Sequence, residues 1–124
     1  MNLAQAYLIG KLTHDPELKT VEINGKEKVN TSFQLAVNSF RANQPASFFK
    51  IEAWDKQAEI ICTYAKKGSE LLIHGELKQE KWTNSNGENK EKVKIIAQSV
   101  QLGNKKEKRD TENTEEIIIE EDIF

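Results

Sequence analysis

The chain has 124 residues, one cysteine and a formal net charge of −2 at pH 7. This length suffices for one domain with a buried core, and the single cysteine, Cys62, excludes an intrachain disulfide framework and fits a reducing compartment. The N-terminus lacks the basic segment and apolar run of a signal peptide, and no apolar stretch reaches membrane-spanning length, so we expect a soluble cytoplasmic protein with no membrane partner.

Two strands are predicted before residue 40. Residues 6–12 form an apolar run of strand length that ends before Pro16, because proline has no amide to donate to a strand ladder. Gly10 within this run indicates a bulge or a close backbone approach. Asn24-Gly25 predicts a tight turn, and residues 29–37 then alternate apolar and polar side chains as a strand does.

The third predicted strand, residues 48–54, presents two different faces. Alternation places Phe49, Ile51 and Ala53 in one row, which we expect to face the core. The other row holds two large aromatics and two charged side chains: Phe48, Lys50, Glu52 and Trp54. Burial of the charged pair would cost its hydration, so this row is expected to meet water, where rings beside lysines suit base stacking and phosphate neutralisation on a single-stranded nucleic acid. The alternative is that the two rings cover a subunit interface.

The period changes at Asp55, where a helix is expected. Asp55 is a candidate cap, Ala58, Ile61 and Ala65 share one face, and Gly68 predicts a left-handed end after about three turns. Residues 71–82 and 93–102, on either side of the Asn86-Gly87 turn, predict two more strands. Three strands, a helix and two strands in a small, all-antiparallel domain indicate an all-β, five-stranded OB-fold barrel with one helix between strands three and four.

Charge divides the chain into a basic body and an acidic tail. Residues 110–124 hold 7 of the 20 acidic residues and no lysine or arginine, whereas the body holds all 18 basic residues, which favours an anionic polymer as its partner. Residues 105–116 have no apolar side chain and are predicted to be flexible. We divide the chain into an OB domain (1–104), a flexible charged linker (105–119) and an acidic protein-docking tip (120–124).

The tip combines acids with apolar residues at the very end of the chain: Glu120, Glu121, Asp122, Ile123 and Phe124. An apolar ring beside the α-carboxylate makes a compact plug for an apolar pocket rimmed by basic side chains. A frayed terminus without a role is the alternative. The acids are also expected to compete with a nucleic acid for the basic body.

Segments along the whole chain resemble the bacterial single-stranded DNA-binding proteins, in the order that this family has them. They are LIGKLTHDPELK (8–19), FQLAVN (33–38), AKKGS (65–69), HGEL (74–77), Lys81-Trp82-Thr83 with Gly87, and the acidic tip ending in Phe124. The resemblance implies an OB barrel that assembles as a homotetramer, wraps single-stranded DNA over aromatic and basic surfaces, and recruits replication and repair proteins through its tip. It also implies a cytoplasmic, nucleoid-associated protein.

The resemblance further implies which residues bind DNA. By position, the base-stacking aromatics fall on Phe40, Phe48, Trp54 and Trp82, with basic support from Lys56, Lys66, Lys67 and Lys81. Trp82 follows a lysine at the exposed end of a hairpin; a ring folded back on its own hairpin is the alternative. For Phe40 the alternative is a lid over the core.

Catalytic motifs and metal-ligand spacings are missing from the sequence. Cys62, His14 and His74 are scattered and do not make a zinc pattern, and no nucleophile–base pair or phosphate-binding glycine loop appears. We therefore expect no enzyme activity, no cofactor and no metal. The predicted function is sequence-independent binding and protection of single-stranded DNA in replication, recombination and repair; the alternatives are an RNA-directed OB-fold protein and an OB-fold protein-interaction adaptor.

Overall fold

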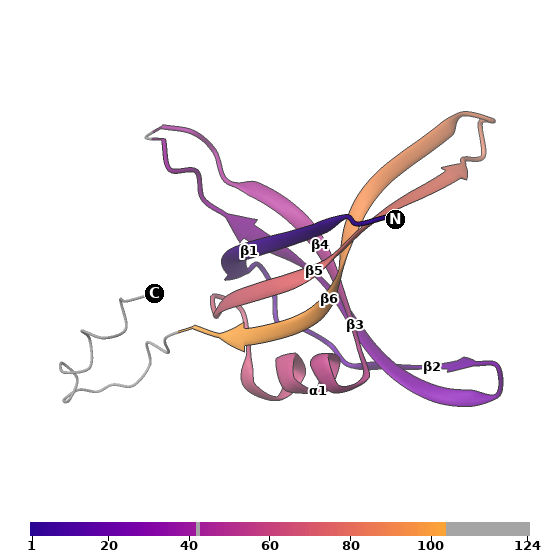
Figure 1. Ribbon diagram of the computed structural model, residues 1–124, viewed down its shortest axis with the longest axis horizontal. Helices are drawn as coiled ribbons and strands as arrows, with labels where there is room; N and C mark the ends of the chain where they lie inside the picture. The colour runs from indigo at the N-terminus through magenta and orange to yellow at the C-terminus, as the bar shows by residue number, and fades with distance from the viewer. Residues whose placement is uncertain (42, 104–124) are drawn as a thin grey trace.

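The computed structural model describes residues 1–41 and 43–103, which form six strands and one helix (Figure 1). In chain order these are β1 (Gln5–Leu12), β2 (Lys19–Ile23), β3 (Lys26–Val37), β4 (Ser47–Trp54), α1 (Asp55–Tyr64), β5 (Glu70–Thr83) and β6 (Asn89–Leu102). The predicted linker (105–119) and docking tip (120–124) lie outside the described residues.

The sheet closes into a ring because β1 pairs with two strands. It runs antiparallel to β5 from Gln5 to Lys11, and its last residue, Leu12, lies opposite Leu35 of β3. The order β1-β5-β6-β4-β3 therefore returns to β1, and β2 extends β3 outside the ring as a hairpin. The prediction of an all-β OB fold, with one helix between the third and fourth strands of a five-stranded ring, is confirmed.

Two features of the sheet differ from the predictions. The β4–β6 ladder is parallel, with Ile51 opposite Ile95, so the expectation of an all-antiparallel domain was wrong. The reason is geometric: a closed ring with an odd number of strands cannot reverse direction at every pair. The strand β2 was not predicted, because residues 19–23 are mostly exposed and are held by pairing with β3 rather than by an apolar row.

Apolar side chains from the inner rows of the ring and from α1 form the core. The largest of those that are fully buried are Leu35, Ile51, Ile61, Leu71 and Ile73. Ala53 is buried as predicted, whereas Phe49 is 38% exposed because it lies toward the outer end of β4, so its assignment to the core was wrong. Helix α1 lies beneath the sheet in Figure 1 and covers one end of the ring with Ala58 and Ile61.

Helix α1 begins without the predicted side-chain cap. The capping position belongs to Trp54, which has extended backbone, and no side-chain capping hydrogen bond forms. The carboxylate of Asp55 instead lies 3.5 Å from Lys28 Nζ on β3. The Asp55 cap prediction was therefore wrong, and this side chain joins the helix to the sheet.

The end of α1 also differs from the prediction. The helix ends at Tyr64, and Ala65 has extended backbone, so Gly68 is not its cap. Gly68 has a φ of 88°, in the left-handed region, and its N–H donates to the Leu12 carbonyl at 2.9 Å. The glycine therefore serves the turn that ties the helix exit to the end of β1.

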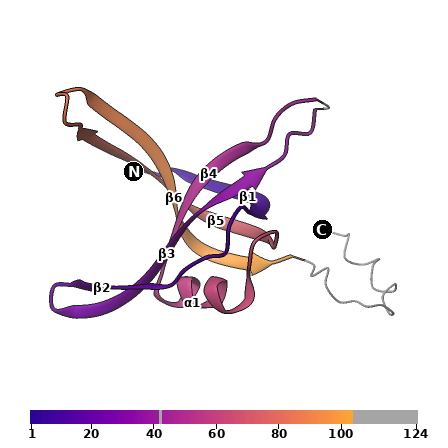
Figure 2. The ribbon, with the colours of Figure 1, turned by 180° about the vertical axis from the view of Figure 1, so that it is seen from behind.

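Gly10 is a point of close backbone approach, as predicted. A Cβ atom at this position would lie 2.4 Å from the Ala36 carbonyl oxygen, where β1 passes from β5 to β3. Beyond the ring, the β2–β3 hairpin, the β3–β4 connection and the β5–β6 hairpin extend away from the core (Figure 2).

Candidate nucleic-acid interface

Strand pairing assembles one outward face from β4, β6 and β5. The parallel ladder puts Lys50 beside Lys94, and the antiparallel β5–β6 ladder puts Lys92 opposite Glu80 and Lys90 opposite Trp82. Paired residues share a face of a sheet, so alternate residues of the three strands form one continuous surface. We call it the β4–β6–β5 face; its residues include Phe48, Lys50, Glu52, Trp54, Lys78, Glu80, Trp82, Lys90, Lys92 and Lys94.

Three of the four predicted aromatics lie on the β4–β6–β5 face. Phe48 is 58% exposed, Trp82 is 45% exposed and Trp54, next to α1, is partly buried, so the row from Phe48 to Trp54 faces outward as predicted. Phe40 lies apart in the β3–β4 connection and is fully exposed, which excludes the alternative of a lid over the core. Their contact with DNA remains a prediction.

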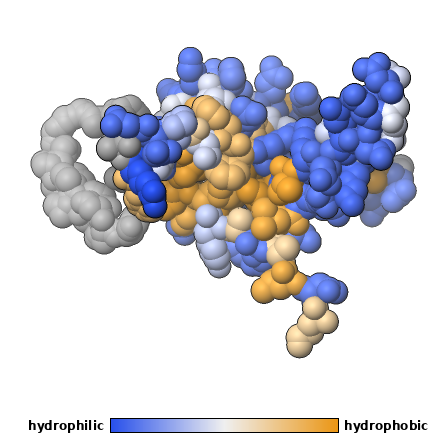
Figure 3. Space-filling model, turned by 90° about the horizontal axis from the view of Figure 1, so that it is seen from above, coloured by the Kyte–Doolittle hydropathy of each residue, from blue (hydrophilic) through white to orange (hydrophobic). Residues whose placement is uncertain are grey.

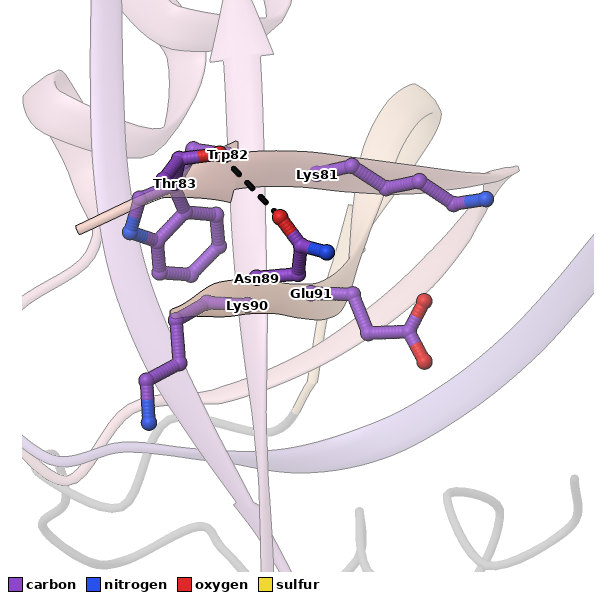
Figure 4. Close-up of a pocket in the computed structure, with 6 residues that line it drawn as sticks. All are labelled: Lys81, Trp82, Thr83, Asn89, Lys90 and Glu91. Atoms are coloured by element: carbon purple, nitrogen blue, oxygen red, sulfur yellow. Dashed lines mark hydrogen bonds between the residues drawn. The ribbon is translucent and has the colours of Figure 1, made fainter. Parts of the chain in front are cut away.

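Trp82 lines a pocket near the end of the β5–β6 hairpin (Figure 4). Its lining residues are Lys81, Trp82, Thr83, Asn89, Lys90 and Glu91. The Thr83 hydroxyl donates to Asn89 Oδ1 at 3.2 Å across the hairpin, and Lys92 Nζ lies 5.9 Å from the centroid of the indole ring. The ring thus packs partly on its own hairpin and keeps an open surface with a cation beside it.

Lys81 points away from the Trp82 ring (Figure 4). Consecutive residues of a strand face opposite sides, and Lys81 lies opposite Glu91 in the ladder, whereas Trp82 lies opposite Lys90. Lys90 and Lys92 therefore lie on the same side of the sheet as the indole ring, whereas Lys81 lies on the opposite side. Neither Lys90 nor Lys92 was among the predicted site residues.

The other predicted lysines lie around α1. Lys56 is exposed in its first turn, two residues after Trp54, and Lys66 and Lys67 are exposed in the turn that follows the helix. The Lys67 N–H donates to the Asp15 carboxylate at 2.7 Å, which fixes the backbone of this turn to the loop after β1. Lys66 and Lys67 are not on the β4–β6–β5 face.

An ion-pair network lies at the centre of the face, and its residues were not identified from the sequence. Lys94 Nζ lies 2.9 Å from Glu52 Oε1 and 2.6 Å from Glu80 Oε2, and its side chain is mostly buried. Hydrogen bonds to Glu80 and Glu52 raise the pKa of Lys94, and the bond from Lys94 lowers the pKa of Glu80. The sequence shows lysines at alternate positions 90, 92 and 94, which indicates that they share one side of a strand. It does not show which carboxylates lie beside them, because that depends on which strands pair.

A second exposed surface lies on the outer side of β1. Tyr7 and Ile9 are exposed there, and Tyr7 stacks on His74 of β5 with ring centroids 4.4 Å apart and planes inclined by 14°. From above, apolar side chains gather across the middle of the molecule, between hydrophilic extensions (Figure 3). The outward residues of β1 and their β5 partners form what we call the β1 face: Gln5, Tyr7, Ile9 and Lys11 with Glu76, His74, Leu72 and Glu70.

The described residues contain no group of three or more His, Cys, Asp or Glu side chains that could hold a metal ion. Within residues 1–41 and 43–103, no helix has the length and apolar character needed to cross a membrane.

A closed OB ring with exposed aromatic rings among lysines has the features of nucleic-acid-binding OB-fold proteins. The model of the Single-strand binding protein family matches residues 3–103. The chain belongs to this family.

Similar relatives come from several bacteria. A single-stranded DNA-binding protein of Treponema pallidum is 36% identical over a 100-residue alignment that covers 77% of this chain and 54% of that protein. One from Onion yellows phytoplasma is 36% identical over 98 residues, with 79% of this chain and 91% of the relative covered. Single-stranded DNA-binding protein 1 of Staphylococcus aureus (strain Mu50) is 36% identical over 115 residues, with 89% and 71% covered. The chain thus spans about half the length of the Treponema protein.

Proposed function

We propose that this chain binds single-stranded DNA without sequence preference and protects it during replication, recombination and repair, as a non-catalytic protein of the cytoplasmic nucleoid. The observation that carries the proposal is the β4–β6–β5 face, where the exposed rings of Phe48 and Trp82 lie among lysines. Every base has a π-face, so stacking on such rings tolerates any sequence, and the lysines neutralise the backbone. The family membership and the names of the relatives support the same ligand.

A titration with oligo-dT, followed by tryptophan fluorescence at several salt concentrations, tests the proposal. Stacking on Trp54 or Trp82 should quench the emission. The affinity should fall as salt rises, and each phosphate neutralised should add about 0.7 to the magnitude of the slope of log affinity against log salt. Oligo-U at equal salt is the matched ligand: tighter binding of oligo-U would favour the RNA-directed alternative. Emission that does not change with either oligonucleotide would favour the interaction adaptor.

We also propose that copies of the chain assemble, most simply as a homotetramer, through the β1 face. The support is the exposure of Tyr7 and Ile9 on adjacent outward positions of β1, because burial of such side chains against a second copy removes apolar area from water. Ile9→Lys should lower the mass measured by light scattering, whereas the charge-matched variant Thr63→Lys, exposed on α1 and away from β1, should leave it unchanged. An unchanged mass for Ile9→Lys contradicts assembly through this face.

The acidic tip is proposed to recruit replication and repair proteins. Its acids and terminal phenylalanine suit an apolar pocket rimmed by basic side chains, and the same acids should compete weakly with DNA for the basic body. Deletion of residues 110–124 should leave oligo-dT affinity equal or higher at low salt while partner capture is lost. A truncated protein that no longer binds DNA would contradict this division of roles.

A further inference from the structure

Three lysines of β4 and β6 lie close together at the centre of the β4–β6–β5 face, and they are not equivalent. Lys50 on β4 is beside Lys94 on β6 in the parallel ladder, and Lys92 is two residues before Lys94 on the same side of that strand. Lys94 is bonded to Glu52 and Glu80 at 2.9 and 2.6 Å, so two carboxylates already neutralise its charge. Lys94 is therefore a poor binding partner for a further anion such as a phosphate.

Lys50 and Lys92 have no such partners. Neither forms a salt bridge with an acid in the part of the chain that the structure describes. Burial, and then the neighbouring charge of Lys92, lower the pKa of Lys50, since both disfavour its ammonium form. The negative charge of Glu80 raises the pKa of Lys50, but Glu80 already forms an ion pair with Lys94. Two cations are therefore held next to each other without an anion between them.

Aromatic rings flank this pair on both sides. Phe48 is two residues from Lys50 on the same side of β4, about 7 Å along the strand. On the other side, Lys92 Nζ lies 5.9 Å from the Trp82 ring centroid. One nucleotide can thus place its base on a ring and its phosphate at the neighbouring ammonium group.

We propose that Lys50 and Lys92 together bind one backbone phosphate of single-stranded DNA, between a base stacked on Phe48 and a base stacked on Trp82. Lys94 is a positioning residue that holds Glu52 and Glu80 away from this phosphate. The inference rests on the proposed function and deepens it, because it assigns the phosphate contact to a pair outside the predicted set of Lys56, Lys66, Lys67 and Lys81. An anion between the two ammonium groups removes their repulsion and makes charge-assisted hydrogen bonds to both.

Oligo-dT binding by Lys50→Gln, Lys92→Gln and the double variant, measured over a range of salt, tests this assignment. Each single variant should weaken binding at low salt, and the double variant should lower the slope of log affinity against log salt by about 0.7, the value for one phosphate on a single strand. Because both lysines bind the same phosphate, the loss of binding free energy in the double variant should be smaller than the sum of the losses in the two single variants. Lys50→Arg keeps the charge and should keep the slope.

The control is Lys26→Gln, which makes the same charge change at the turn end of the β2–β3 hairpin, outside the β3–β4 ladder, and should leave the slope as in the original chain. Folding is checked by thermal unfolding; Lys50→Gln removes a repulsion, so the variant is expected to fold. A slope and affinity equal to those of the original chain in the double variant would overturn the assignment. Failure of the original chain to bind oligo-dT at all would instead refute the proposed function, and the assignment with it.

Discussion

Substitution of Trp82 by alanine measures how much of the affinity comes from base stacking at the β5–β6 hairpin. Trp82 lies beyond the core and keeps 45% of its surface exposed. A tryptophan side chain can bury about 200 Å², so about 90 Å² remains for a base to cover, worth about 2 kcal/mol at about 25 cal/mol per Å². This agrees with the about 1 to 3 kcal/mol measured per stacked base in other proteins. The affinity for oligo-dT should therefore fall about 30-fold.

Anisotropy of a labelled oligo-dT is the suitable assay, because it does not depend on the tryptophan that is removed. Trp82→Phe is the control: a smaller ring should retain much of the affinity. The thermal midpoint of Trp82→Ala should change little, since the ring contributes to the hairpin and not to the core. Unchanged DNA affinity would refute the stacking argument, and an unfolded variant would show that Trp82 is a structural residue.

Three further predictions concern stability. Gly10→Ala would place a Cβ 2.4 Å from the Ala36 carbonyl oxygen and should lower the free energy of unfolding by about 1 to 3 kcal/mol; an unchanged urea midpoint would contradict the close approach of β1 to β3. Thr31 is fully buried and its hydroxyl has no hydrogen-bond partner among the described residues, so Thr31→Val should raise the free energy of unfolding by about 1 kcal/mol and the melting temperature by about 4 to 8 °C. A lower melting temperature would mean that the hydroxyl is satisfied. The bond from Lys94 lowers the pKa of Glu80 below its ordinary value of 4.5, so the stability it adds is present above that value and is lost as pH falls through the lowered pKa. Glu80→Gln should therefore unfold in urea with a weaker dependence on acid pH, and identical pH dependence in the two proteins would count against the network.

Local patterns predicted most of the strands and the core of this chain. The alternation over residues 29–37 and 71–82 corresponds to β3 and β5, and Leu35, Ile51 and Ile73 are buried on their inner rows. Errors arose where an element continues past the core. The polar residues 89–92 extend β6 beyond the predicted start at 93, because they pair along β5 and need no apolar row.

The alternation along β4 by itself determined that Phe48 faces outward with Lys50, since side chains of one strand alternate whatever the strand pairs with. It could not reveal that Trp82, in a different hairpin, shares this face, nor that Lys94 is neutralised by Glu52 and Glu80 while Lys92 is left without such partners. The shared face and the Lys94–Glu52 pair depend on the parallel β4–β6 ladder, in which Lys50 lies opposite Lys94, 44 residues later in the chain. Only closure of the ring decided that ladder, because which strand edges meet is set by packing around a shared core and not by the residues next to them in the chain.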